Sequence, residues 1–168
     1  MNQIQRDLVF DLFKENSRIF FSSMCEEGDI QLYNLMKMPN FEDFWFSMIT
    51  LHSFNDKMLF KVFFKNKIEP QALFSEDAFN LYEKLCQMVI GTVKTGLGKC
   101  GIDSGISLPY TTRGFANIWS KADETEFNHY HWWCLESNEQ QVICFLGCDL
   151  KSDFDTRIFK KHLLNFAI

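Results

Sequence analysis

Two histidines and three cysteines lie close together in the last third of the chain, and these residue types could hold a zinc ion. They are His129, His131, Cys134, Cys144 and Cys148. Zinc sites in small modules use closely spaced ligand pairs, and this set does not match that spacing. On a strand, His129 and His131 point to one face and Cys134 to the other. The pattern therefore predicts an ordinary half-buried hairpin without metal.

Other residues that could do chemistry lack a local pattern. Six cysteines and four histidines could supply a thiol nucleophile, but no motif marks one and buried cysteines are usually inert. Asp149, Asp153 and Asp155 resemble a cation loop without its glycine and its distal glutamate. Gly96 and Gly98 follow a helix, whereas phosphate binds where a helix begins. These observations predict a chain that is not an enzyme and needs no cofactor and no metal.

Glycine and proline concentrate between residues 100 and 123 of an otherwise Phe-rich chain. Gly101 and Gly105 fit a tight connection that leaves a helix and enters a strand. Residues 106–110 read as that strand, 111–114 as a hairpin turn and 115–120 as the returning strand.

Apolar spacing and turn residues predict the elements that position these segments. Helices are expected at 2–25, 30–38, 75–95 and 155–168, and strands at 44–51, 58–64, 128–135 and 141–148, besides the two above. We expect Ser75 to cap the third helix, and Gly96 and Gly98 to end it. This order predicts an α+β fold, with a central antiparallel sheet flanked by helices in an α-β-α sandwich like that of PAS and GAF domains.

Composition limits the classes of function. A chain of 168 residues corresponds to about one domain, residues 1–168. The net charge of −5 and the absence of basic runs argue against direct nucleic-acid binding. No membrane span or signal peptide is evident, and cysteines without framework spacing indicate reduced thiols in the cytoplasm. Nineteen Phe and four Trp predict either an aromatic core or a cavity around an apolar ligand.

The segment Gly-Ile-x-x-Gly-Ile-x-x-Pro, followed by a turn and Gly-Phe-x-x-Ile-Trp-Ser-x-Ala, resembles the N-terminal autoinducer-binding domain of LuxR-type quorum-sensing regulators. The resemblance covers about a quarter of the chain. It implies that the Ser120 hydroxyl contacts a bound signal molecule, and that Glu69, before Pro70, takes the place of the family's ligand-binding aspartate. The family's Trp-x-x-Tyr pattern is absent here, which implies a divergent receptor for a more apolar or aromatic molecule. The candidate ligand-binding residues are Ser120, Glu69, Trp119, Tyr110, Trp45 and Phe60.

The first functional hypothesis is therefore a signal-sensing domain of a bacterial transcription regulator. It would be cut from a longer regulator, bind a small apolar molecule in an aromatic-lined pocket, and form a homodimer. It would contact DNA through a domain outside this chain and would not contact a membrane. The alternative hypothesis is a PAS-like protein–protein interaction module without ligand. A small cytosolic enzyme is a third and weaker reading.

Overall fold

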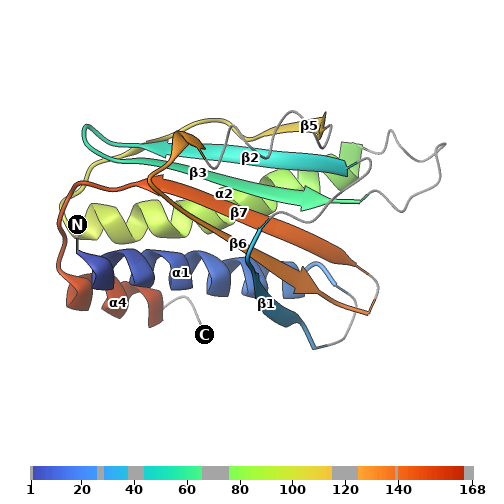
Figure 1. The fold of residues 1–168 in the computed structure, drawn as a ribbon, viewed down its shortest axis with the longest axis horizontal. Coiled ribbons are helices and arrows are strands. Elements are labelled where there is room, and N and C mark those ends of the chain that lie inside the picture. Colours follow the sequence, from blue (N-terminus) through green and yellow to red (C-terminus); the bar gives the residue numbers. More distant parts are fainter. Residues whose placement is uncertain are drawn as a thin grey trace.

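The computed structural model describes residues 2–25, 29–37, 44–65, 76–114, 125–138 and 140–164. The described residues form three helices, with three strands between the first two and four between the last two (Figure 1). The helices are α1 (Gln3–Ser22), α2 (Glu76–Lys99) and α4 (Thr156–Leu164). The strands are β1 (Gln31–Leu35), β2 (Phe44–His52), β3 (Lys57–Phe64), β4 (Gly105–Ile106), β5 (Tyr110–Gly114), β6 (His129–Glu136) and β7 (Gln141–Asp149).

Local sequence explains where α1 begins and where α2 ends. The Asn2 side chain accepts a hydrogen bond from the Gln5 backbone N–H, and the Gln5 side chain accepts one from the Asn2 N–H, which forms a capping box. Beyond Lys99, Gly101 adopts a φ of 82°, which favours glycine. Its neighbour Ile102 donates to the carbonyl of Leu97, and Gly101 donates to that of Gly98, as in a Schellman motif.

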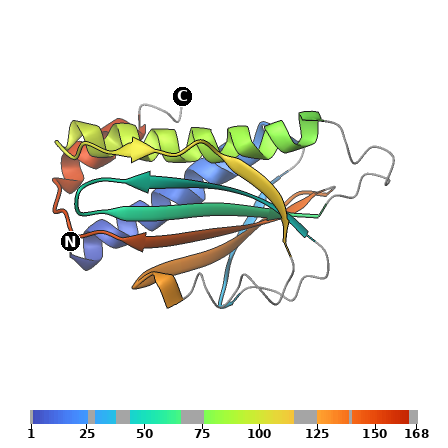
Figure 2. The same ribbon diagram turned by 90° about the horizontal axis from the view of Figure 1, so that it is seen from above.

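All the strands join one antiparallel sheet in the order β1-β6-β7-β3-β2, and β4 and β5 both pair with the outer edge of β2. The helices α1, α2 and α4 lie on one side of this sheet (Figure 2). The predicted α+β class, with a central antiparallel sheet and flanking helices, is confirmed. The expected α-β-α sandwich would place helices on both faces, whereas the described helices cover one face (Figure 2).

Alternation along the strands gives the sheet two apolar faces. The face toward the helices carries the larger core, which includes Phe60 of β3, Trp133 of β6, Phe13 of α1 and Phe159 of α4. The other face carries a second cluster, in which Phe46, Phe63, Trp132 and Phe145 are buried. Phe127 completes this cluster by packing over Gly147, where the ring would leave no room for a β-carbon.

The hairpins β2–β3 and β6–β7 and the helices α1, α2 and α4 lie where the sequence predicts them. Four local predictions are wrong. The strand expected at 106–110 does not form, because β4 ends at Ile106 and β5 begins at Tyr110. Residues 31–35 form the edge strand β1 and not a helix, because they pair with β6. Residues 111–114 belong to strand β5 and not to a turn, because they pair with β2. Helix α2 continues through Gly96 and Gly98 to Lys99. The predicted cap Ser75 and the predicted strand 115–120 lie outside the described residues.

Among the helices described, none combines the length and the apolar character that crossing a membrane requires.

Candidate functional site

The structure describes three of the six residues that the sequence assigned to one ligand site. Phe60 is fully buried, with its ring centroid 5.3 Å from that of Phe13 and 5.9 Å from that of Trp133. Trp45 lies on β2 and packs against Phe79 of α2, with ring centroids 4.7 Å apart. Tyr110 lies on β5 at the sheet edge and is 53% exposed.

The other three members of that set, Ser120, Glu69 and Trp119, lie outside the described residues. The assignment of the six residues to one site therefore stays a prediction.

Aromatic rings pack against one another between the sheet and the helices in the part of the chain that the structure describes. The Phe60 ring lies between Phe13 and Trp133, and Phe64 stacks on Tyr82 with centroids 3.7 Å apart. The Trp133 indole N–H donates to the buried Ser17 hydroxyl at 2.9 Å. The aromatic excess thus builds packed layers on both faces of the sheet.

The zinc-like residues of β6 divide between the two faces, as strand alternation predicts. His131 faces α1, with its ring 4.2 Å from that of Phe10, whereas Cys134 belongs to the cluster on the opposite face. Burial lowers the pKa of His131, and the charge of Lys14 lowers it further. His129 contacts the Arg6 guanidinium at 2.7 Å. In the described residues, no three His, Cys, Asp or Glu side chains are grouped to hold a metal ion.

The environment of the buried thiols makes them poor nucleophiles. The six cysteines are free. Burial raises the pKa of the Cys86 thiol, and the charge of Glu83 raises it further. Burial likewise raises the pKa of Cys148 to about 12. Because the thiolate is the reactive form, such cysteines are unreactive near neutral pH.

The outer side of α2 gathers exposed side chains of mixed chemistry along about two and a half helical turns. We call Asn80, Leu81, Lys84, Gln87 and Met88 the α2 outer patch. Residues three and four apart lie next to one another on a helix, so this spacing puts them on one side. All five are exposed, and Leu81 and Met88 keep 37% and 40% of their surface accessible.

The opposite side of α2 holds the helix firmly on the sheet. Leu85, Val89 and Val93 are fully or almost fully buried in the core. Near the start of the helix, Tyr82 stacks on Phe64 of β3. Burial raises the pKa of Tyr82 to about 12, and the neighbouring Cys25 thiol adds to the effect. A helix held in this way presents its outer side chains in fixed positions.

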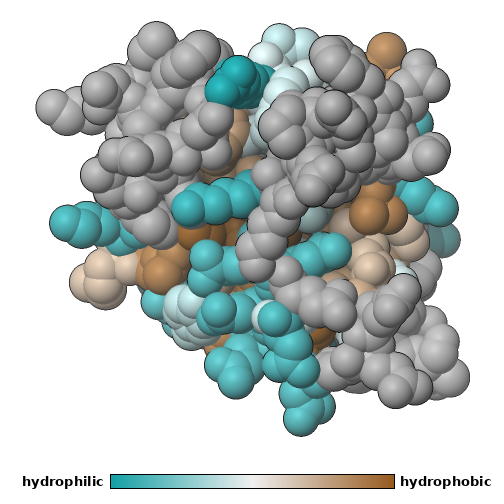
Figure 3. Space-filling view, turned by 90° about the vertical axis from the view of Figure 1, so that its right-hand side faces the viewer, coloured by the Kyte–Doolittle hydropathy of each residue, from teal (hydrophilic) through white to brown (hydrophobic). Residues whose placement is uncertain are grey.

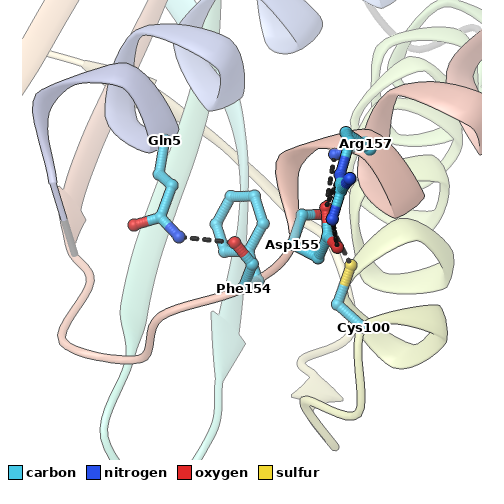
Figure 4. A network of polar contacts seen from close by, with 5 residues as sticks. All are labelled: Gln5, Cys100, Phe154, Asp155 and Arg157. Carbon is cyan, nitrogen blue, oxygen red and sulfur yellow. Dashed lines mark hydrogen bonds and ion pairs between the residues drawn. The ribbon is translucent and has the colours of Figure 1, made fainter.

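Near the C-terminal end of α2, polar contacts tie the segment that leads into α4 to both α1 and α2 (Figure 4). The Gln5 amide of α1 donates to the carbonyl of Phe154 at 2.5 Å, just before α4. Asp155 accepts from the Arg157 backbone N–H at 2.8 Å, while the Cys100 thiol donates to the Asp155 carbonyl at 3.7 Å. Phe159 of α4 packs onto Gly96, where a β-carbon would lie 2.8 Å from its ring. Gly96 therefore permits the close approach of α4.

Each of the two long helices carries charges of both signs, distributed differently along its length. The exposed side of α1 carries Asp7, Asp11 and Glu15, spaced four residues apart. In α2, every charged residue between 84 and 99 is a lysine: Lys84, Lys94 and Lys99. The end of the molecule on the right of Figure 1 shows many hydrophilic side chains with smaller hydrophobic areas between them (Figure 3).

The α2 outer patch combines the features of a protein-docking site. Exposed Leu81 and Met88 can bury apolar surface against a partner, and Met adapts to irregular surfaces. Asn80 and Gln87 end in amides that both donate and accept hydrogen bonds. Lys84 adds an ammonium group between them. Helical spacing places Leu81 and Met88 beside the buried stripe of α2 and predicts that they widen it, whereas both are partly exposed in the structure.

No family model matches this chain, and no curated protein matches it. Solved structures do share its fold. A chemotactic CheC-like protein from Shewanella oneidensis is 17% identical, with a TM-score of 0.64 over 84% of this chain and 98% of that one. CheX from Vibrio vulnificus is 12% identical, with a TM-score of 0.61 over 84% and 99%.

A third similar chain comes from the CheX–CheY–BeF3–Mg2+ complex of Borrelia burgdorferi. It is 8% identical, with a TM-score of 0.64 over 84% of this chain and 97% of that one. At these identities the comparisons establish a shared fold.

These comparisons overturn the functional predictions made from the sequence. The resemblance to LuxR-type regulators is wrong, because the similar structures are chemotaxis proteins. The predicted roles in transcription regulation and quorum sensing are wrong for the same reason. A small-molecule partner, with DNA reached through another domain, is also wrong, since one similar structure is a complex with the protein CheY. The same complex contains BeF3 and Mg2+, which overturns the expectation that the chain is not an enzyme.

Proposed function

We propose that residues 1–168 form a single cytoplasmic domain that docks a CheY-like receiver domain and accelerates the loss of its phosphoryl group. The observation that carries the proposal is the fold shared with CheX, which is found in a complex with CheY, BeF3 and Mg2+. BeF3 is a tetrahedral stand-in for a phosphoryl group, and Mg2+ binds phosphate and carboxylate oxygens. The alternative of a protein-interaction module, raised by the sequence, is thus nearer to this function than a ligand sensor.

The α2 outer patch supplies groups suited to this reaction. In the hydrolysis, a water oxygen attacks phosphorus, the bond between phosphorus and the receiver's oxygen breaks, and inorganic phosphate leaves. Little covalent chemistry falls to the protein, so positioning and charge stabilisation dominate. An amide side chain such as that of Gln87 or Asn80 can orient the attacking water, as glutamine does in some phosphohydrolases.

The apolar members of the patch give the first test of docking. Binding of a purified CheY-like receiver, loaded with BeF3 and Mg2+, can be measured by biolayer interferometry. We expect Leu81→Ser combined with Met88→Ser to weaken binding about tenfold or more, because exposed apolar anchors carry much of the affinity of an interface. The matched control is Ile4→Ser on α1, where the side chain is 68% exposed and lies outside the patch.

The control variant is expected to bind within twofold of the wild type. Equal weakening by Ile4→Ser and by the double variant would place the contact elsewhere. Circular dichroism of each variant checks that the fold is kept, and the exposure of all three side chains makes unfolding unexpected.

A further inference from the structure

The basic residues of α2 and α4 form a second feature that the sequence did not reveal. The chain has a net charge of −5 and no basic run longer than two residues. Residues 84–99 nevertheless contain three lysines and no Asp or Glu, and α4 adds Lys160 and Lys161. We call Lys84, Lys94, Lys99, Lys160 and Lys161 the basic band.

Folding brings the C-terminal part of α2, which carries Lys94 and Lys99, against α4. Lys84 lies about three helical turns earlier in α2. Helix α4 packs on α2 through Phe159 and Gly96, three residues before Lys99. Lys160 and Lys161 of α4, like Lys84 and Lys99 of α2, are exposed. In the described part of the chain, no carboxylate lies within ion-pair distance of these lysines, whereas Arg157 is paired with Asp155 at 3.1 Å.

We infer that the basic band recognises the anionic surface around the phosphorylation site of the receiver, with Lys84 placed against the phosphoryl group itself. The inference rests on the proposed function. Charge complementarity supports it: a surface that binds Mg2+ and a phosphoryl group is built from carboxylates and phosphate oxygens, so it attracts ammonium groups. Lys84 is the band's member inside the α2 outer patch, within one turn of both amides.

This arrangement has two measurable consequences. Exposed charges at the rim of an interface act mainly on the association rate, and salt screens them over about 10 Å at 0.1 M ionic strength. Lys160 and Lys161 therefore speed up association. Lys84 acts at the phosphoryl group, so it favours the phosphorylated receiver over the unphosphorylated one.

The test measures binding of a CheY-like receiver with BeF3 and Mg2+, and with Mg2+ alone, at 50 and 300 mM NaCl. We expect the affinity of the wild type to fall at least fivefold between the two salt concentrations. Lys84→Gln is expected to weaken binding of the BeF3-loaded receiver five- to tenfold, and of the unloaded receiver less than twofold. Lys160→Gln with Lys161→Gln is expected to slow association about threefold and to leave dissociation unchanged.

Lys37→Gln, which removes one exposed charge outside the band, is the matched control and is expected to bind like the wild type. Binding that is insensitive to salt and unaffected by Lys84→Gln would overturn the inference and leave the proposed function standing. A wild type that binds neither form of the receiver at either salt concentration would overturn the proposed function, and the inference with it.

Discussion

Replacing Asp56 by alanine is expected to destabilise the fold, because this carboxylate joins two parts of the chain. Asp56 is 4% exposed and lies in the turn between β2 and β3. One of its oxygens accepts from the backbone N–H groups of Lys151 and Ser152, at 2.8 and 2.9 Å. The other accepts from the Ser53 hydroxyl at 2.6 Å. The turn is thereby fixed to the segment that leads from β7 into α4.

The magnitude follows from these three hydrogen bonds. A buried donor left without an acceptor costs about 1–3 kcal/mol, but the N–H of Lys151 can be hydrated because this residue lies at the surface. We therefore expect Asp56→Ala to lower the free energy of unfolding by about 2–4 kcal/mol. For a chain of this size that corresponds to a fall of about 6–12 °C in Tm. Differential scanning calorimetry or thermal circular dichroism measures it.

The direction of the pKa shift of Asp56 predicts how the stability of the fold depends on pH. Burial raises the pKa of Asp56, but the hydrogen bonds from Ser152, Ser53 and Lys151 outweigh it and hold the pKa below its usual value. The carboxylate therefore stabilises the fold fully above its unfolded pKa of about 3.9, and this stabilisation is lost as the pH falls through the folded pKa. The stability difference between the wild type and Asp56→Asn should be constant from pH 5 to 8 and shrink below pH 4. A difference that stays unchanged at pH 3 would refute this reasoning, as would an Asp56→Ala variant with the Tm of the wild type.

Two further predictions concern packing. Gly147→Ala is expected to lower the free energy of unfolding by about 1–3 kcal/mol, since the new β-carbon would lie 2.4 Å from the Phe127 ring. The control is Gly98→Ala in an exposed part of α2, where a β-carbon would have no atom within 4 Å. This variant should raise the free energy of unfolding by up to about 1 kcal/mol. Urea unfolding decides between them, and equal effects of the two variants would contradict the packing of Phe127. Ser17→Ala is expected to cost about 1–2 kcal/mol, because it leaves the buried Trp133 indole N–H without an acceptor; an unchanged urea midpoint would show that this hydrogen bond contributes nothing.

Local sequence patterns were sufficient to predict most of the helices and strands. Runs of apolar residues predicted the β2–β3 and β6–β7 hairpins, and helical spacing predicted α1 and α2. Residues 31–35 were mistaken for helix because Leu32 and Leu35 have helical spacing. Their strand exists because it pairs with β6, a hundred residues later in the chain. Thr111 was assigned to a turn from its local sequence alone. In the structure it pairs with the distant Ser47 of β2, and the two hydroxyls lie 2.6 Å apart.

The candidate site was harder to predict than the fold. The abundance of aromatic residues was ambiguous between a packed core and a ligand cavity, and only the arrangement of rings such as Phe13, Phe60 and Trp133 distinguishes the two. The basic band joins lysines of α2 and α4 that lie more than sixty residues apart in the sequence. Helix α4 and the C-terminal part of α2 become neighbours through the contact of Phe159 with Gly96, which no local pattern predicts.

The most direct test of the central claim is the rate at which a phosphorylated CheY-like receiver loses its phosphoryl group, followed by phosphate release. We expect the chain to accelerate this loss at least tenfold. We expect Asn80→Ala with Gln87→Ala to remove most of the acceleration, while Asn34→Ala, an exposed amide on β1, leaves it intact. A rate of phosphate release that the chain does not change, measured at a concentration at which it binds the receiver, would contradict the account.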